Sequence, residues 1–330
     1  MIQSPIHTQP KIYGLHQQFL IFTAADGNYA LQAMVLLLSL VKTQVSPTHL
    51  VIFGCNWSNR NRQRLMSLAT SDVTVEIVEV DNSAFTDINL LSKFPLATAY
   101  NVIAPRYYIK NEGRALYLDA DTVVLDDLGI LWNTPMSTPV AAVVDAHIGW
   151  VASPSMWRPW REESLSPLAP YLNTGVMLID LDAWRDSRMT ERILHLLAKY
   201  HLPCADQDAI NLSLKGSFDE LPPKFNSMPY HLLTKLRNVD AVTDDDLIGV
   251  CISTPTILHF HRSFLGKPWT LGSIHPATNL WRALASEANP RWKRSTDFVG
   301  LLRRFAANQA KMLSLDIRST DQSELIHKIY

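Results

Sequence analysis

The chain has 330 residues, of which 47% are hydrophobic and 18% are charged, so it can bury a large core and lacks the composition of a disordered protein. Its 30 basic and 31 acidic residues nearly cancel, which argues against nucleic acid or another polyanion as a partner. Three widely spaced cysteines, Cys55, Cys204 and Cys251, argue against a disulfide framework or a thiolate zinc site and indicate a reducing, cytoplasmic compartment.

The first segment, residues 1–18, is expected to be an N-terminal extension. It contains Pro5 and Pro10 but no basic segment followed by an apolar run and a small-residue cleavage site, so no secretory signal is predicted and the mature chain is expected to begin here. The most apolar stretch, residues 30–41, is shorter than the roughly 20 residues that span a bilayer. It is predicted to be a buried helix.

Strand and helix signals alternate from residue 19 onward. Apolar runs predict strands at 19–24, 49–53, 73–80, 114–118, 140–144, 175–181 and 256–259. Helices are predicted after the turn at 25–28, after the cap Ser58, and at 190–200 and 206–214. This alternation predicts an α/β fold with a mainly parallel central sheet flanked by helices. Because ligands bind beyond the carboxyl ends of such strands, the residues that follow each strand are the candidate site.

Two carboxylates follow the predicted strand 114–118. Asp119 and Asp121 are two residues apart, so they point the same way in extended backbone. Hard oxygen ligands there suit an octahedral ion such as Mg²⁺ or Mn²⁺ that keeps positions open for phosphate oxygens. The same spacing recurs at Asp180/Asp182, Asp206/Asp208 and Asp244/Asp246. Only the first pair lies between two strongly apolar runs, where carboxylates are costly unless they are paired or metal-bound; a capped turn is the alternative.

A third ligand is available at the end of the predicted strand 256–259. His259 and His261 are also two residues apart, and a neutral imidazole suits Mn²⁺. Lys267, after Gly266, is placed to meet a phosphate as a point charge. The alternative is a core histidine and a solvated lysine.

Five short blocks occur in order: Ala24-Ala-Asp-Gly-Asn-Tyr29, Tyr117-Leu-Asp-Ala-Asp121, Tyr171-Leu-Asn-Thr-Gly-Val-Met-Leu-Ile-Asp180, Asp206-Gln-Asp208, and His259-Phe with Gly266-Lys-Pro-Trp269. Together they resemble the signature blocks of the family 8 retaining glycosyltransferases, which include bacterial lipopolysaccharide galactosyl- and glucosyltransferases and glycogenin. The resemblance implies a GT-A fold, a UDP-sugar donor, Mn²⁺ or Mg²⁺, and transfer of a hexose with retention of anomeric configuration. It covers most of the chain.

The resemblance also assigns roles by position. Donor contacts fall to Ala24, Asp26, Asn28, Asp119, Ala120, Asp121, Gly266 and Lys267. Metal ligands are Asp119, Asp121 and His259, with His261 as the alternative, and the transferred sugar is expected to meet Asp145, Asn173, Asp206 and Gln207. Each has a structural alternative: Asp26 and Asn28 can cap a helix, Asp145 and Asn173 can be turn residues, and Asp206 with Gln207 can open a helix.

Two positions depart from the family pattern. The family commonly has Tyr-x-Arg-Leu before the metal motif, with the arginine near the donor, but here Val102 stands at the arginine position in Tyr100-Asn-Val-Ile. Arg106 lies one turn further on, and the residues leave open whether it substitutes. The spacing from His259 to Lys267 exceeds the usual six residues, whereas His261 to Lys267 equals it. The His-Phe dipeptide and the strand end favour His259.

Retention of configuration by double displacement needs a carboxylate nucleophile near the anomeric carbon. By resemblance Gln207 lies near that face, and an amide is a poor nucleophile. Attack by the acceptor on the face from which UDP leaves is therefore our hypothesis. Trapping a covalent glycosyl-enzyme on Gln207 or Asp206 would refute it.

Acceptor choice is expected to lie in residues 147–170, a long irregular segment with Trp150, Trp157 and Trp160. Indole faces can stack on sugars, and packing of the loop onto the core is the alternative. The acceptor implied by the resemblance is a cell-surface glycan or glycolipid such as lipopolysaccharide.

Residues 19–270 are predicted to be the transferase domain and 271–330 a helical C-terminal region. Six basic residues stand against one acid between Arg291 and Lys311, with apolar residues at helical spacing, which predicts an amphipathic basic helix over 291–312. Such a helix can lie on the inner face of an anionic membrane or pack on the domain.

Two other classes of function compete with the transferase. A nucleotidyltransferase is expected to show a glycine- and lysine-rich phosphate loop near its first strand, and residues 25–29 are not one. A non-catalytic nucleotide-sugar-binding protein of the same fold is the remaining alternative, since Val102 would suit lost activity; the complete Asp119, Asp121, histidine and Lys267 set argues against it.

Overall fold

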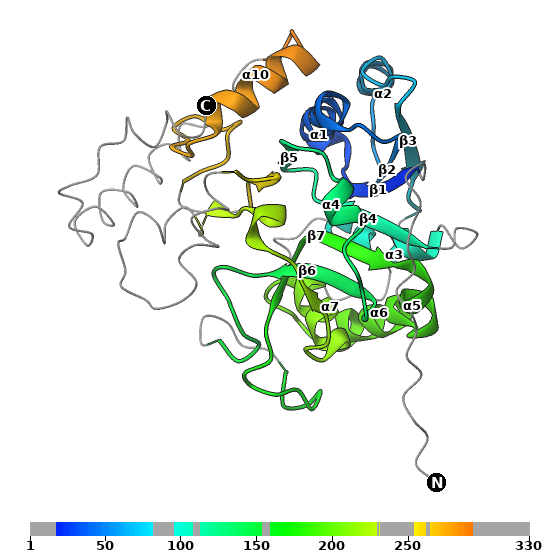
Figure 1. Cartoon of the computed structure of the whole chain (residues 1–330), viewed down its shortest axis with the longest axis vertical. Helices are drawn as coiled ribbons and strands as arrows, with labels where there is room; N and C mark the ends of the chain where they lie inside the picture. The colour runs from blue at the N-terminus through cyan, green and yellow to red at the C-terminus, as the bar shows by residue number, and fades with distance from the viewer. Residues whose placement is uncertain are drawn as a thin grey trace, which may run out of the picture.

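The computed structural model describes residues 18–81, 96–107, 113–153, 159–229, 231, 254–261 and 265–292. Its centre is a seven-stranded sheet with helices around it (Figure 1). In chain order the strands are β1 (Phe19–Ala24), β2 (Thr48–Gly54), β3 (Val73–Glu79), β4 (Arg114–Leu118), β6 (Val140–Val144), β7 (Leu172–Asp180) and β8 (Asp219–Glu220). In space their order is β3-β2-β1-β4-β7-β6-β8.

Strand β7 is the exception in an otherwise parallel sheet. It runs antiparallel to both of its neighbours, β4 and β6, while the pairs β1/β2, β2/β3, β1/β4 and β6/β8 are parallel. The prediction of a mainly parallel α/β sheet is therefore confirmed. Because β7 is reversed, its first residues lie at the same edge as the last residues of β4.

A second, two-stranded sheet pairs β5 (Thr122–Val124) with β9 (Ile257–His259) in antiparallel register. His259 is opposite Thr122 in this register, and the backbone N–H of Phe260 donates to the carbonyl of Asp121 over 2.9 Å. An isolated bridge joins Ser227 to Leu258 on the other side of β9. Three segments that are far apart in the sequence therefore meet beside the end of β4.

The helices surround this framework. They are η1 (Gly27–Tyr29), α1 (Ala30–Thr43), α2 (Asn59–Met66), η3 (Leu96–Ala99), α3 (Tyr100–Tyr107), α4 (Gly129–Trp132), α5 (Leu181–Asp186), α6 (Met189–Lys199), α7 (Ala205–Leu214), η4 (Pro223–Asn226) and α10 (Thr278–Ala288). Helix α3 packs against β1 and β2, α5 against β4, and α7 against β7. Ten of the 14 residues of α1 are buried, as its apolar composition predicts.

The order of the strands reverses between β1 and β4. Strands β1, β2 and β3 follow one another outward, and the chain then returns to place β4 on the other side of β1. In open α/β sheets this switch point is where ligands bind, beyond the carboxyl ends of the two strands. The segment after β1, which begins at Ala25, and the segment after β4, which begins at Asp119, therefore leave the sheet side by side at one edge.

Helix α10 belongs to the same core as the sheet. It packs on α1, and Trp281 and Ala285 are fully buried in the core cluster. The Trp281 ring lies 5.1 Å from the ring of Trp269, and Arg282 donates to the carbonyls of Pro268 and Thr270 over 2.9 and 3.1 Å. Helix α10 thus supports the loop that carries Lys267. The boundary at residue 270 stays a prediction.

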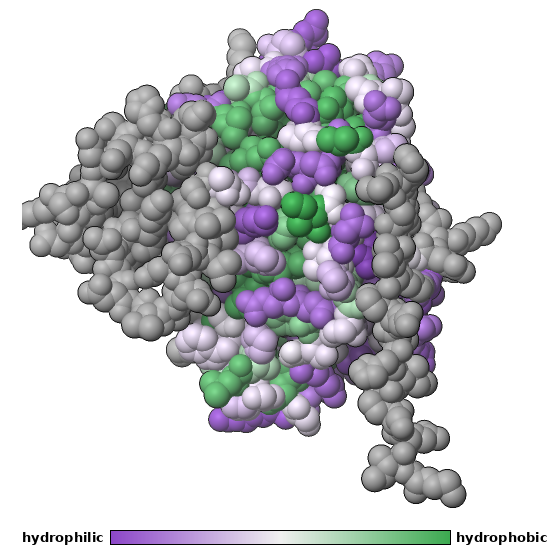
Figure 2. All heavy atoms as spheres, in the orientation of Figure 1, coloured by the Kyte–Doolittle hydropathy of each residue, from purple (hydrophilic) through white to green (hydrophobic). Residues whose placement is uncertain are grey.

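Several predicted features lie outside the described residues. They are almost all of the extension 1–18, most of the basic helix 291–312, Trp157, and the pair Asp244/Asp246. No helix within the described ranges combines the length and apolarity needed to cross a bilayer. Figure 2 shows hydrophobic and hydrophilic residues interspersed over the face seen in Figure 1, with hydrophobic ones gathering towards the end that carries α1 and α10.

Candidate active site

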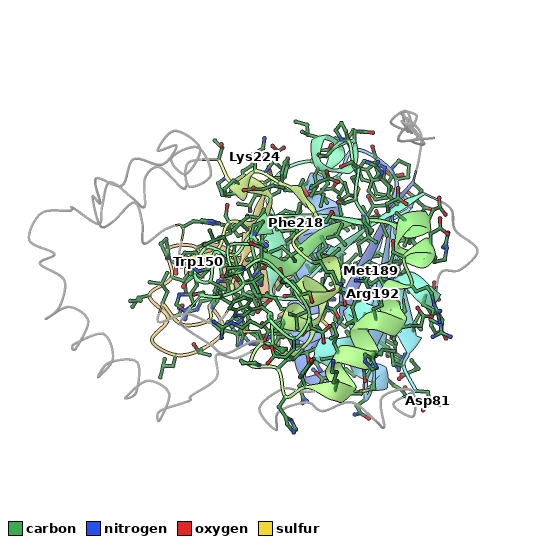
Figure 3. The ribbon with its side chains drawn as sticks, turned by 90° about the horizontal axis from the view of Figure 1, so that it is seen from below. Asp81, Trp150, Met189, Arg192, Phe218 and Lys224 are labelled. Carbon is green, nitrogen blue, oxygen red and sulfur yellow. The ribbon has the colours of Figure 1, made fainter. Side chains whose placement is uncertain are left out.

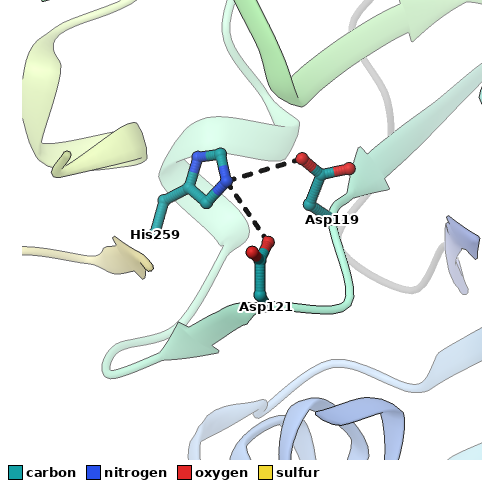
Figure 4. Close-up of side chains that lie close together, drawn as sticks. All are labelled: Asp119, Asp121 and His259. Carbon is teal, nitrogen blue, oxygen red and sulfur yellow. Dashed lines mark ion pairs between the residues drawn. The ribbon is translucent and has the colours of Figure 1, made fainter. Parts of the chain in front are cut away.

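Three side chains converge beside the end of β4. Asp119 and Asp121 come from the turn between β4 and β5, and His259 ends β9 (Figure 4). The Nε2 atom of His259 lies 3.4 Å from Oδ2 of Asp119 and 3.3 Å from Oδ1 of Asp121. One ligand atom from each residue lies within 4.8 Å of the other two, and no other group of three or more potential ligands is found among the described residues.

Lys267 adds a positive charge to this group. Its ammonium forms an ion pair with Oδ2 of Asp121 and lies 5.3 Å from the centre of the Trp269 ring. Gly266 before it has a φ of 75°, in the left-handed region, which glycine adopts without strain. The loop therefore presents a cation at the point where the two carboxylates meet.

The charges in the group shift each other's pKa values. Burial alone would raise the pKa of Asp121, but the Lys267 ammonium and His259 lower it below its usual range. For His259 burial would lower the pKa, yet hydrogen bonds to Asp119 and Asp121 raise it to about 9. A divalent ion between the three groups would displace the proton on Nε2 and take its place. The donor set, two carboxylates and one imidazole, suits Mn²⁺ and leaves room for phosphate oxygens.

Two further residues determine the shape of the group. The hydroxyl of Tyr117 donates to Oδ1 of Asp119 over 2.8 Å and so fixes that carboxylate. Gly175 in β7 lies directly beside it, since the backbone N–H of Asp119 donates to the Gly175 carbonyl over 2.8 Å. A Cβ on Gly175 would lie 2.2 Å from Cε1 of His259 and 2.8 Å from Oδ2 of Asp119. A side chain there would fill the space that the three ligands share.

The residues predicted to face the sugar form a second cluster. Asn173 donates from Nδ2 to Oδ2 of Asp145 over 2.9 Å, and Gln207 donates from Nε2 to the same oxygen over 3.3 Å. The other carboxylate oxygen of Asp145 accepts the backbone N–H groups of His147 and Ile148, each over 2.9 Å. Burial would raise the pKa of Asp145, but these hydrogen bonds, that of Asn173 first, lower it. Asp145 is thus held as a carboxylate.

Asp206 lies at the start of α7, next to Gln207. Its Oδ2 atom accepts a hydrogen bond from Nδ2 of Asn101 over 2.6 Å. Val102, at the position of the family arginine, is fully buried. Within α3, Asn101 is the residue that hydrogen-bonds to Asp206, whereas Arg106 forms an exposed ion pair with Glu191 over 3.7 Å. Substitution of Arg106 for the family arginine stays a prediction.

The protonation of Asp206 leads to a prediction about stability. Burial raises the pKa of Asp206 to about 8. The negative charge of Asp119 also raises this pKa, whereas the hydrogen bond from Asn101 lowers it. An unfolded Asp titrates near 3.9, so the folded chain holds a proton that the unfolded chain has lost, and stability falls as pH rises from about 4 to 8. The melting temperature of Asp206→Asn should therefore exceed that of wild type by an amount that grows from pH 5 to pH 8.5. Calorimetric melts in chelator test this, and a pH-independent difference would contradict it.

The loop after β1 is closely fixed. Asp26 caps η1 by accepting the backbone N–H groups of Asn28 and Tyr29, and Nδ2 of Asn28 donates to Oδ2 of Asp26 over 3.1 Å. The helix-cap role is thus present. Gly27 approaches the neighbouring loop so closely that a Cβ on it would lie 2.1 Å from the carbonyl oxygen of Asn56. Nucleoside binding by Ala24, Asp26 and Asn28 stays a prediction.

His261 lies beside the group without joining it. Its ring centre is 5.4 Å from that of His259, and burial, followed by the neighbouring His259, lowers its pKa to about 4. The structure thus brings His259, and not His261, between the two carboxylates.

The segment predicted to choose the acceptor, residues 147–170, starts two residues after Asp145. Trp150 pairs with Pro170 in an isolated bridge and is 46% exposed. Figure 3 shows Trp150 well apart from Met189 and Arg192 of α6. Trp160 is partly buried against the core, and the Arg161 guanidinium lies 4.6 Å from its ring centre, so Trp150 is the more exposed of these two indoles.

Four residues near the site were given no role by the sequence reasoning. They are Asn101, Tyr117, Gly175 and Asn226. Tyr117 and Gly175 lie inside quoted blocks, so their position was a usable signal. Asn101 precedes Val102 in the departing motif. Asn226, in η4, carried no local signal because only the pairing of Ser227 with β9 places it beside His259.

A mainly parallel sheet with two carboxylates, an imidazole and a lysine at its switch point defines an α/β protein suited to a diphosphate ligand with a divalent ion. The sequence profile of glycosyl transferase family 8 matches residues 20–271. The chain belongs to that family and is a glycosyltransferase by descent, as its motifs predicted.

Relatives and solved structures agree with this assignment. The chain is 28% identical to general stress protein A of Bacillus subtilis (strain 168), over 78% of this chain and 89% of that protein. It is 32% identical to a lipopolysaccharide 1,2-glucosyltransferase of Escherichia coli (strain K12), over 54% of this chain and 50% of that protein. A crystal structure of galactosyltransferase LgtC with donor and acceptor sugar analogues has a TM-score of 0.67 at 21% identity, covering 86% of this chain and all of that one. The fold is GT-A, which confirms the predicted fold class.

Proposed function

We propose that this chain is a metal-dependent retaining glycosyltransferase that moves a hexose, galactose or glucose, from a UDP-sugar to a cell-surface glycan or glycolipid such as lipopolysaccharide. The observation that carries the proposal is the meeting of Asp119, Asp121, His259 and Lys267 at the switch point of a family 8 chain. The names of the Escherichia coli relative and of LgtC support the choice of hexose and acceptor class.

The donor diphosphate is placed against this group. Asp119, Asp121 and Nε2 of His259 would hold Mn²⁺ or Mg²⁺, which when bound neutralises negative charge on the departing UDP. Lys267, in the loop after β9, pairs with Asp121 at this metal group. Its ammonium can exchange the Asp121 carboxylate for a phosphate oxygen without leaving the site. Ala120 and Gly266 bring backbone close to the diphosphate, and the Ala24–Asn28 loop at the end of the neighbouring strand β1 takes the uridine.

The transferred sugar is placed between the metal group and the Asp145 cluster. Asp145 and Asn173 offer hydrogen bonds to sugar hydroxyls, and Gln207 and Asp206 line the side next to α7. The four hydrogen bonds that the two oxygens of Asp145 accept from described residues weaken it as a nucleophile, and the raised pKa of Asp206 keeps that group neutral near pH 7. These features favour attack by the acceptor on the face from which UDP leaves.

The acceptor is placed beside the segment after Asp145. Trp150 is exposed there and can stack on a sugar ring. Acceptor binding at this position would bring a hydroxyl towards Asp145 and Gln207 from the solvent side.

The test is release of UDP from UDP-galactose, UDP-glucose, UDP-N-acetylglucosamine and UDP-galacturonic acid, with Mn²⁺ and with chelator. We expect turnover of one hexose donor that requires the metal. Saturable UDP binding without turnover of any donor, even with a panel of glycan acceptors, would favour the non-catalytic nucleotide-sugar binder. Turnover that resists the chelator would contradict metal dependence. Failure of the chain to bind UDP at all would contradict the whole proposal.

A further inference from the structure

A line of buried side chains connects the two clusters of the site. Nδ1 of His259 lies 3.0 Å from Oδ1 of Asn226, whose Nδ2 donates to Oδ1 of Asn173 over 2.9 Å. Nδ2 of Asn173 then donates to Oδ2 of Asp145 over 2.9 Å. His259, Asn226, Asn173 and Asp145 are each at most 5% exposed, so water does not compete for these hydrogen bonds. The line runs from the carboxylate group to the sugar-facing cluster.

The direction of every hydrogen bond in this line follows from the backbone. The N–H of Gly175 donates to Oδ1 of Asn173 over 3.1 Å, and a backbone N–H can only donate, so this atom is the amide oxygen. Asn226 must then offer its NH₂ group to Asn173, which turns its own oxygen towards His259. An amide oxygen only accepts, so Nδ1 of His259 carries the hydrogen.

The opposite end of the line is anchored in the same way. Oδ1 of Asp145 accepts the backbone N–H groups of His147 and Ile148, so the carboxylate is oriented by the main chain and can only accept from Asn173 while it is ionised. The amide orientations are therefore determined from both ends, and no member of the line can reverse alone.

This direction has a consequence for His259. A neutral imidazole carries one hydrogen, and if Nδ1 keeps it, the lone pair is on Nε2, the atom between Asp119 and Asp121. Partners of this kind fix the tautomer and ring orientation of metal-binding histidines. The bridge between Ser227 and Leu258 holds the end of η4 beside β9, and this places the Asn226 amide next to His259.

We propose that Asn226 is a positioning residue for metal binding: it holds His259 in the Nδ1–H tautomer with Nε2 aimed between Asp119 and Asp121, and through Asn173 it aligns Asp145 with the metal group. The proposal rests on the proposed function, since it concerns the same metal. It adds a residue outside the five motif blocks to the machinery of the site.

Mn²⁺ affinity of the full chain in the presence of UDP, measured by electron paramagnetic resonance, tests this. We expect Asn226→Ala to weaken Mn²⁺ binding about 10- to 100-fold, the usual effect of losing such a partner. Asn226→Asp keeps an acceptor for Nδ1–H, as in carboxylate–histidine–metal sites, and should restore most of the affinity. Asn226→Asp removes the hydrogen-bond donor to Asn173, so its KM for the UDP-sugar should remain above that of wild type.

The matched control is Asn211→Ala. Asn211 is 3% exposed, and among the described residues its amide bonds only to backbone groups of Leu172 and Gln207, so its loss should lower the melting temperature and leave Mn²⁺ affinity unchanged. Equal Mn²⁺ affinity of Asn226→Ala and wild type would overturn the inference. So would an equal loss in Asn211→Ala, because the effect would then be general packing.

A measurement on the native sequence covers the case in which Asn226→Ala does not fold. In the Mg²⁺–UDP complex, the ¹⁵N signal of His259, identified by its absence in His259→Gln, should show a protonated Nδ1 and a bare Nε2. A protonated Nε2 would overturn this inference and leave the proposed function standing. A wild type that binds neither Mn²⁺ nor Mg²⁺ would overturn both this inference and the proposed function.

Discussion

Replacing Asp121 with Asn is expected to lower glycosyl transfer on the order of 10³-fold. The variant keeps the size of the side chain but removes a charge that would ligate the metal and that pairs with Lys267. A metal that stabilises a leaving group contributes several kcal/mol, and about 4 kcal/mol corresponds to about three decades in rate. The measurement is kcat/KM for UDP release at saturating Mn²⁺, with Mn²⁺ affinity determined in parallel.

The matched control for this variant is Asp182→Asn. Asp180 and Asp182 repeat the Asp-x-Asp spacing, but Asp180 is opposite Arg114, at the far end of β4 from Asp119. Asp182 pairs with Arg185 in α5, so its replacement should leave Mn²⁺ affinity and turnover within about twofold of wild type, the scale of a surface pair. Similar losses in both variants would show that the position at the switch point does not distinguish Asp121 from Asp182, and would contradict the assignment of the metal site.

The second large effect is expected for Gly175→Ala. The new Cβ would lie 2.2 Å from Cε1 and 2.7 Å from Nδ1 of His259, and 2.8 Å from Oδ2 of Asp119. The His259 side chain is only 3% exposed and cannot swing into solvent, so the ring and the carboxylate must separate. We expect Mn²⁺ binding to be lost, activity to fall by at least about 10²-fold, and overpacking to cost about 1–3 kcal/mol of stability.

Gly149→Ala separates loss of the metal from loss of stability. Gly149 has a φ of 72° with nothing within 4 Å of a Cβ, so alanine there costs about 1–2 kcal/mol through backbone strain without touching the metal group. The two variants should therefore melt at similarly lowered temperatures while only Gly175→Ala loses Mn²⁺. Normal Mn²⁺ affinity in Gly175→Ala would contradict the geometry of the group.

The sequence predicted the central strands closely because each is a short apolar run bounded by turn residues. Strands 19–24, 114–118 and 140–144 have the predicted bounds, and α6 and α7 begin within a residue of theirs. Their order in space was not predicted, since pairing depends on contacts between distant segments. The direction of β7 is the clearest case: its antiparallel pairing with β4 is what carries Asn173 and Gly175 to the functional edge.

The candidate site was predictable where motifs follow strands and not where loops meet. Asp119, Asp121 and His259 each stand at a strand end, and the structure brings them together. The short strand β5, with three residues, gives too weak a periodic signal to predict, although it places His259 beside Asp121. Asn226 and Asn101 act through contacts 33 and 105 residues away, which no local pattern reports.

The most direct test of the proposed metal site is a crystal of the chain with Mn²⁺ and UDP, measured at a wavelength where manganese scatters anomalously. We expect an anomalous peak bounded by carboxylate oxygens of Asp119 and Asp121 and by Nε2 of His259, with the diphosphate between the peak and Lys267. A peak ligated by His261, or a diphosphate bound with no metal at this position, would contradict it.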